Sequence, residues 1–433
     1  MIDAHRIKNF AALALNPARE AALKLAEAAF QSLDTRAVIR KAVSSTAGEL
    51  RVSGTTFPLT GNGRIFIVGV GKCSLEAVLE LEAILGERIA GGAVIDVRQP
   101  EVLPKRTRFF LGDHPFPTEN NIKATAEIIK LLSQLNQDDL VIFVISGGGS
   151  ALLCQPDSHT YLEEVELTKH LFRTGATIGE LNTVRKHLSL ARGGYLAKQV
   201  YPARVVSLIF SDVPGNNLEF ISSGPTIKDD STIEDAKRII IKYDASHKGE
   251  TIIKHLLETP KEDKYFERVT NLLVLTNETA LQAMADLAPS LGLTATIKDT
   301  AIAGEARVMG EAIARALRLA PAGSLHLYGG ETTVVIHGVG HGGRNQELAL
   351  GALSLLTAGE CVLAFASDGV DNGDHGGALC DTITGERARA VGLDPVVLLD
   401  QNDSYTFFAK VGDYLDTGYV GANVSDLIIA LKI

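Results

Sequence analysis

Short apolar runs alternate with amphipathic segments over most of this chain. Four runs contain few polar residues, as buried strands do: 65–70, 91–98, 141–146 and 204–210. Segments rich in strong helix formers come between them, for example 74–85 and 118–135. This alternation of strand, loop and helix predicts a parallel α/β sheet.

Helices are also expected over 3–48 and 161–200, because both segments have helical periodicity. A second set of units begins at Val269. It includes expected helices at 305–320 and 345–357, a strand entering the loop at 361–373, and two strands around a Gly-Gly turn within 324–338.

A charged stretch at about 228–268 separates the two sets of units. We therefore expect an N-terminal α/β domain at 1–245, a connection at 246–268 and a C-terminal α/β domain at 269–433. The expected fold class is α/β, with mainly parallel, Rossmann-like sheets in two domains and a cleft between them.

The composition narrows the class of protein. The chain has 433 residues and a net charge of -10, which argues against a general nucleic-acid binder. No apolar run reaches the roughly 18 residues that a membrane span needs, and the N-terminus has no apolar signal core, so we expect a cytoplasmic protein. The four cysteines form no CxxC pair, which predicts reduced thiols and no structural zinc.

Glycine-rich loops follow two of the expected strands. GVGKCS at 69–74 places Lys72 at a helix start behind Gly69 and Gly71, although it matches neither a P-loop nor GxGxxG. SGGGSA at 146–151 offers backbone donors for phosphate oxygens. We assign Ser146 as a candidate substrate contact. Six residues of the two loops are candidate cofactor contacts: Gly69, Gly71, Gly147, Gly148, Gly149 and Ser150. The alternative is that both loops are tight turns. A hydrolase role for Ser150 is weak, because GxSxG is absent.

Carboxylates occur in the loops after other expected strands. Asp212 in SDVPGN is positioned to take a hydroxyl proton or to hold Mg²⁺. Asp368 and Asp371 in SDGVDN offer the same chemistry, and Asp368 is a candidate substrate contact. The alternative for each is an Asx turn or a helix cap.

Two arginines complete the candidate chemistry. Arg344 follows a glycine-rich segment at 337–343 and precedes a helix, and its guanidinium suits a carboxylate or a phosphate. His337 and His341 have a metal-binding spacing, but their glycine-rich context argues against a helix there. Arg185 is either a carboxylate ligand or part of a solvated basic face. Lysine, arginine, aspartate and glycine-rich loops at strand ends are the set that phosphoryl transfer uses.

The ordered motifs GVGKCS, SGGGSALL, LNTVRKHLSLARGG, SDVPGN with SSGPT, GGRNQELAL and ASDGVDN resemble the type II glycerate kinase family, also called glycerate 2-kinases. The C-terminal part of that family is the MOFRL domain. The resemblance covers about residues 10–433. It implies ATP-dependent phosphorylation of glycerate to 2-phosphoglycerate, with ATP and Mg²⁺ as cofactors. It also implies catalytic roles for Lys72, Asp212 and Arg344, and we add Asn277 and Glu331 as cofactor contacts.

The chain departs from the family pattern at three places: 372–375, 419–422 and His341. These departures leave other hydroxy acids open as substrates, and they leave open an inactive homologue. A hydroxypyruvate reductase is a further alternative, although no GxGxxG with a following acidic residue is present. We expect a small-molecule substrate, no nucleic-acid or membrane partner, and a monomer or homodimer.

Overall fold

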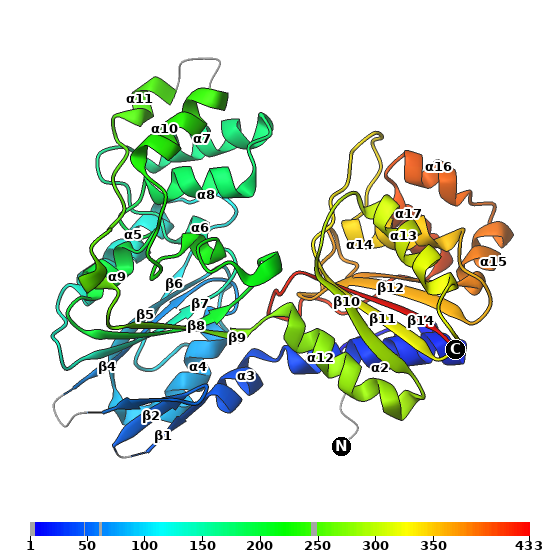
Figure 1. Cartoon of the computed structure of the whole chain (residues 1–433), viewed down its shortest axis with the longest axis horizontal. Helices are drawn as coiled ribbons and strands as arrows, with labels where there is room; N and C mark the ends of the chain where they lie inside the picture. The colour runs from blue at the N-terminus through cyan, green and yellow to red at the C-terminus, as the bar shows by residue number, and fades with distance from the viewer. Residues whose placement is uncertain (1–4, 47, 60–62, 244–248) are drawn as a thin grey trace. The chain divides into compact units, whose positions relative to one another are not determined.

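The computed structural model describes residues 5–46, 48–59, 63–243 and 249–433 (Figure 1). Its elements form two compact units. The N-terminal unit contains residues 35–211 and 216–274, and the C-terminal unit contains residues 1–34, 212–215 and 275–433.

The N-terminal unit is built on a six-stranded sheet. In spatial order its strands are β6 (Arg108–Leu111), β5 (Ile89–Asp96), β4 (Ile65–Val70), β7 (Leu140–Ile145), β8 (Arg204–Phe210) and β9 (Val269–Leu275). All pairs from β6 to β8 are parallel. β4 and β7 are buried along their whole length, as strands with helices on both faces must be. The predicted α/β fold is confirmed.

Nine α-helices belong to the described part of this unit: α3 (Thr35–Ala42), α4 (Ser74–Leu85), α5 (Glu119–Leu132), α6 (Gly149–Leu152), α7 (Tyr161–Arg173), α8 (Ile178–Lys186), α9 (Tyr195–Val200), α10 (Ile233–Tyr243) and α11 (Gly249–Ile253). The expected helical stretch at 161–200 is divided into three helices. Gly175 and Gly194 have positive φ angles of 85° and 83°, which interrupt the helical backbone.

A small antiparallel sheet contains β1 (Val43–Ser45), β2 (Glu49–Val52) and β3 (Thr55–Pro58). The helix expected to continue to residue 48 was therefore wrong after Ala42. The sequence from 49 to 52 buries alternate residues, and this period of two belongs to a strand.

The C-terminal unit has a mixed five-stranded sheet. Its spatial order is β10 (Thr294–Ile302), β11 (Ser324–Gly330), β14 (Asp426–Lys432), β12 (Glu360–Ala366) and β13 (Gly377–Cys380). Only β10 and β11 pair in parallel, because the last strand of the chain inserts antiparallel between β11 and β12. The second strand expected within 324–338 is instead a loop, whose one isolated β-bridge joins Thr333 to Glu305.

Helices cover both faces of this sheet (Figure 1). α2 (Pro17–Ser32) and α12 (Asn277–Leu287) pack together on one face, and α13 (Ala306–Arg318) packs against α14 (Arg344–Leu353) on the other. The remaining α-helices of the unit are α1 (Phe10–Leu13), α15 (Thr382–Ala390), α16 (Pro395–Asp400) and α17 (Ser404–Val411).

Residues 1–34 were assigned to the first domain from the sequence, but they cluster with the C-terminal unit. The reason is the buried face of α2, which packs on β12 and β14. The expected boundary at 245–246 lies outside the described residues. Residues 249–268, expected as part of a connection, cluster with the N-terminal unit.

No described helix combines the length and apolar character needed to cross a bilayer. All four cysteines are buried free thiols.

A buried ion-pair network fixes α2 to the C-terminal unit. Arg19 is fully buried, and its Nη1 lies 2.7 Å from Asp413 Oδ1 while its Nη2 lies 2.7 Å from Asp381 Oδ1. Thr384 accepts a further hydrogen bond from Nη2 at 2.9 Å. Burial opposes the charge on Arg19, but the two carboxylates outweigh it and raise the pKa of the guanidinium. Each charge therefore depends on the others for compensation.

Replacing Arg19 by methionine should destabilise the C-terminal unit by about 3–5 kcal/mol, because buried Asp381 loses its cationic partner and buried Asp413 keeps only Arg387. Urea unfolding followed by circular dichroism measures this loss. Lys24→Met is the matched control on the same helix, since Lys24 forms only an exposed pair with Glu20. Equal stability of the two variants would contradict a structural role for the network.

Candidate active site

The two glycine-rich loops of the N-terminal unit lie side by side. β4 and β7 are neighbours, and the loops after them are joined by a hydrogen bond of 3.0 Å from Lys72 N to Gly147 O. Gly71 has φ +121°, and a Cβ there would lie only 2.1 Å from Ser146 Oγ. The close approach of the loops therefore requires glycine at 71.

Gly69 has a different role from the one predicted. A Cβ on this residue would lie 2.7 Å from a methyl carbon of Val94 and 2.9 Å from one of Val78. The absence of a side chain at 69 therefore allows β4, β5 and α4 to pack closely. Nothing in this environment places Gly69 against a ligand.

His114 joins Lys72 at the SGGGSA loop. A Cβ on Gly148 would lie 3.3 Å from both His114 Cδ2 and Lys72 Cγ, so the two side chains flank this glycine. Partial removal from water, together with the charges of Lys72 and Arg185, lowers the pKa of His114 to about 4. Sequence analysis missed His114. The available signal was its position just after β6, at the same carboxyl edge of the sheet.

Two serines, Ser222 and Ser223, contact the SGGGSA loop through their hydroxyl groups. Ser222 Oγ donates to Ser146 O at 2.7 Å, and Ser223 Oγ lies 2.8 Å from Ser150 Oγ. Both residues, which belong to the SSGPT motif, have left-handed φ angles, 53° and 57°. Such backbone costs about 1–3 kcal/mol at a non-glycine residue and is concentrated at functional sites.

Arg185, on α8, adds a second positive charge near this loop. Burial and then the charge of Arg192 lower the pKa of Arg185 to about 10. Burial alone would raise the pKa of Glu164, but Arg192, whose Nη1 lies 2.6 Å from it, outweighs burial and lowers that pKa to about 2. The single carboxylate of Glu164 therefore interacts with both Arg185 and Arg192.

We call Lys72, His114, Arg185 and the loop 146–150 the cationic cluster.

Arg344 lies at the start of α14 and is held by two carboxylates. Its Nε lies 2.5 Å from Asp426 Oδ2, and its Nη2 lies 2.8 Å from Glu331 Oε1. Among the described residues, Nη1 has no hydrogen-bond partner. Glu331, expected as a cofactor contact, binds the arginine in this structure.

Asp371 and Asp426 are both buried around the first turn of α14. Asn345 Nδ2 donates to Asp426 at 2.9 Å and to Asp371 at 3.2 Å. Asp371 also accepts from the backbone N–H groups of Asn345 and Gln346, as a helix-capping carboxylate does. Burial raises the pKa of Asp371, and burial with repulsion from Asp371 raises the pKa of Asp426 to about 7 despite Arg344.

The other predicted residues of the C-terminal unit lie at different places. The backbone carbonyl oxygen of Asp212 accepts a 2.8 Å hydrogen bond from Ser425 Oγ, and Ser425 is the residue before Asp426. Asp368 Oδ1 accepts from Val370 N at 3.1 Å, which is the Asx turn given as the alternative. Asn277 donates to Thr300 O at 2.8 Å and ties α12 to β10.

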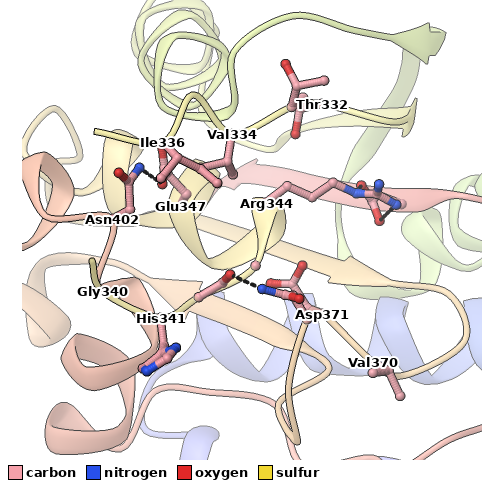
Figure 2. Close-up of a pocket in the computed structure, with 15 residues that line it drawn as sticks. Thr332, Val334, Ile336, Gly340, His341, Arg344, Glu347, Val370, Asp371 and Asn402 are labelled. Carbon is pink, nitrogen blue, oxygen red and sulfur yellow. Dashed lines mark hydrogen bonds and ion pairs between the residues drawn. The ribbon is translucent and has the colours of Figure 1, made fainter. Parts of the chain in front are cut away.

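A cavity of about 610 Å³ opens beside Arg344 (Figure 2). Loops 332–336, 340–343 and 370–372 line it, together with Glu347, Asn402 and Asp426. His341 and Asn372, two of the departures from the family pattern, are among the lining residues. His337 uses its backbone N–H to bind Asn402 Oδ1 at 2.7 Å.

The high pKa of Asp426 makes stability depend on pH. The folded protein holds this proton up to about pH 7, whereas the unfolded chain releases it near its ordinary pKa of 3.8. Stability from the bound proton is therefore present at low pH and is lost as the pH rises from about 4 to 7. In Asp426→Asn, the free energy of unfolding should fall about 2–4 kcal/mol less over this range. Urea unfolding at several pH values measures the difference, and parallel curves for the two proteins would contradict the assignment.

Comparison with known proteins identifies the family. The chain matches the model of a domain of unknown function, DUF4147, at residues 21–258 and the MOFRL family model at 324–426. D-glycerate 2-kinase of Thermotoga maritima is 37% identical over 91% of this chain and 96% of that protein. Glycerate 2-kinase of Pyrococcus horikoshii is 37% identical over 95% of this chain and 97% of that protein.

A solved structure of a relative supports the kinase family, whereas the name of another relative suggests a reductase. A crystal structure of glycerate kinase from Thermotoga maritima has a TM-score of 0.85 at 34% identity and covers 96% of this chain and 99% of that chain. A relative from Agrobacterium vitis, 36% identical over 92% of this chain and 94% of that protein, carries a provisional hydroxypyruvate reductase name. With both family models matched and close relatives aligned along nearly their whole length, this chain belongs to the type II glycerate kinase family with a C-terminal MOFRL domain.

Proposed function

We propose that this protein transfers the γ-phosphoryl group of ATP to the 2-hydroxyl of D-glycerate, giving ADP and 2-phosphoglycerate. The observation that carries the proposal is the position of Lys72 and Arg185 around His114, beside a loop of backbone donors. Both reactants are anions, and fixed cations beside a phosphate-binding loop stabilise them. The relatives from Thermotoga and Pyrococcus, which are named as glycerate 2-kinases, support the same reaction.

Arg185 is the candidate for the glycerate carboxylate, because guanidinium groups bind carboxylates in a bidentate manner. Lys72 and the N–H groups of residues 147–150 are candidates for the phosphate oxygens, with Ser146 beside the acceptor. Transition-state charge spreads over the phosphoryl oxygens, so fixed cations there lower the barrier.

Asp212 is the candidate that receives the proton of the 2-hydroxyl as the new oxygen–phosphorus bond forms and the bond between Pγ and the β,γ-bridging oxygen breaks. Arg344 offers Nη1 to the transferred group, while Asp426 and Glu331 hold the guanidinium in place. The structure gives less support to ligand contacts by Asp368, Asn277 and Gly69. A turn, a hydrogen bond between elements and close packing explain their observed positions.

In the described part of the chain, no three His, Cys, Asp or Glu side chains are grouped so that they could hold a metal ion. Mg²⁺ commonly keeps several waters and is bound by one or two carboxylates plus phosphates. We therefore assign Asp212 as a single carboxylate for an ion that arrives with the nucleotide and, when bound, neutralises phosphate charge.

The reductase alternative has less support. The first glycine-rich loop lacks the dinucleotide fingerprint, and its glycines allow close packing.

The four buried thiols fit a reducing compartment, and the cytoplasm is the proposed location.

Incubation with ATP, Mg²⁺ and D-glycerate, followed by ³¹P NMR, tests the reaction. A 2-phosphoglycerate signal is the expected product. A 3-phosphoglycerate signal would keep the kinase and overturn the 2-hydroxyl as acceptor. Oxidation of NADH with hydroxypyruvate, without phosphorylation, would overturn the kinase.

Lys72→Ala should lower kcat about 10²–10³-fold, because a fixed charge on the phosphoryl oxygens is lost. Steady-state kinetics with glycerate and ATP measure the change. Lys130→Ala, on exposed positions of α5 in the same unit, is the matched control and should leave kcat unchanged. Near-normal kcat in a folded Lys72→Ala protein would remove Lys72 from the mechanism.

Arg344→Ala should lose activity to a similar extent. Arg344→Lys should recover little, because the compact ammonium of lysine lacks the planar fork with which the guanidinium binds Asp426 and Glu331 and directs Nη1 elsewhere. Arg318→Ala, on an exposed position of α13, is the control. Full activity of Arg344→Lys would show that charge alone is required.

A further inference from the structure

His375 lies between two tyrosine rings in the C-terminal unit. Its ring centroid is 4.2 Å from that of Tyr405 and 4.0 Å from that of Tyr414, with interplanar angles of 10° and 12°. The residue is only 5% exposed. Contact on both faces holds the plane of the imidazole and leaves its edges for hydrogen bonds. His375 also belongs to the segment 372–375, where the chain departs from the family pattern.

One edge of the imidazole contacts Gln346. His375 Nδ1 lies 3.2 Å from Gln346 Oε1. At the other end of that amide, Nε2 lies 3.2 Å from both the backbone carbonyl oxygen and Oδ2 of Asp371. A backbone carbonyl oxygen can only accept, so Gln346 must direct its NH₂ group towards Asp371 and its oxygen towards His375. Because an amide oxygen also can only accept, Nδ1 of His375 must carry a proton.

This contact determines the tautomer of His375. Burial lowers the pKa of the imidazole, although Asp374, Asp371 and Asp416 oppose that shift. At neutral pH the ring is therefore uncharged and carries one N–H group, which the contact with Gln346 assigns to Nδ1. Gain of a second proton would leave Nδ1 a donor, so the hydrogen bond is present in both charge states.

Asp371 links the Gln346 amide to the backbone around Arg344. Its carboxylate accepts from the backbone N–H groups of Asn345 at 3.1 Å and of Gln346 at 2.9 Å. A Cβ at Gly343 would lie 2.1 Å from Asp371 Cγ, so the carboxylate packs directly against the residue before Arg344. One carboxylate therefore holds the backbone on both sides of Arg344. A shift of this carboxylate would displace the arginine from its observed position.

We propose that His375 is a positioning residue for Arg344, acting through the amide of Gln346 and the carboxylate of Asp371. The Nδ1–H group of His375 fixes the direction in which the Gln346 amide faces, and that amide helps to hold Asp371 against the start of α14. The inference rests on the proposed contact of Arg344 with the transferred phosphoryl group and deepens it.

A crossed pair of substitutions separates the hydrogen bond from the stacking. His375→Phe keeps a ring between the tyrosines but leaves the Gln346 oxygen without its donor, and it should lower kcat about tenfold. The KM for glycerate should stay within about twofold, because the carboxylate of glycerate is assigned to Arg185 in the other unit. His375→Asn loses the ring but keeps a donor bonded to Cγ, as Nδ1 of histidine is. It should retain at least about half of the wild-type kcat, with a lower melting temperature.

His326→Phe is the matched control, because it makes the same change at a buried histidine of the same unit. Among the described residues, His326 Nδ1 has no hydrogen-bond partner, so kcat should be unchanged. Near-normal kcat in a folded His375→Phe protein would overturn the inference. Loss of activity in His375→Asn but not in His375→Phe would do the same, since stacking rather than the hydrogen bond would then be required.

A double substitution distinguishes positioning of Arg344 from a general structural defect. In an Arg344→Lys background, His375→Phe should change kcat by less than about twofold, because the guanidinium that His375 positions is absent. An equal, tenfold loss in both backgrounds would overturn the inference, because the defect would then be unrelated to Arg344.

Solvent exchange at Arg344 tests the inference without activity. In protein labelled with ¹⁵N-arginine, the Nε–H signal of Arg344 is identified by its loss in Arg344→Lys. Its exchange should be at least tenfold faster in His375→Phe than in wild type or His326→Phe, because Nε donates to Asp426 only when the arginine is held in place. Unchanged exchange would overturn the inference even in an active kinase. Faster exchange in a protein that does not phosphorylate glycerate would overturn only the proposed reaction.

Discussion

Two buried carboxylates organise the C-terminal unit. Asp426 begins the central strand β14, Asp371 lies in the loop after β12, and Asn345 at the start of α14 donates hydrogen bonds to both. A buried carboxylate without partners costs several kcal/mol, so these segments can fold only in an arrangement that satisfies both groups. That arrangement positions Arg344, fixes the adjoining loop 340–343 and shapes the cavity beside it.

The units differ in how they balance charge. In the C-terminal unit, Arg344 is compensated by Asp426 and Glu331, and it serves as a fixed donor with one nitrogen to offer. In the N-terminal unit, Lys72 and Arg185 lie near His114, whose pKa they help to lower, and Glu164 is already bound to Arg192. Positive side chains therefore gather at the SGGGSA loop in one unit, whereas in the other unit two carboxylates hold the guanidinium of Arg344 in place.

The local chemistry of the chain was largely predictable. The strand-end positions of the loops at 69–74 and 146–151 follow from apolar runs that end in glycine, and the structure pairs the strands before them. The same reasoning missed His114, because a single histidine after a weakly apolar strand gives no pattern. It also expected Gly69 to be a cofactor contact, although the close packing of Val94 and Val78 explains the glycine there.

By itself, the sequence determined the α/β class, the two sets of units and the residue types available at strand ends, since these depend on periodicity and composition within short windows. Only the tertiary structure decided where distant segments belong. Arg19 places residues 1–34 with the C-terminal unit through Asp381 and Asp413, and β14 inserts antiparallel between two strands formed far earlier in the chain. Partners more than 300 residues apart leave no local periodicity, so the buried charge of Arg19 acquires its meaning only when the chain has folded.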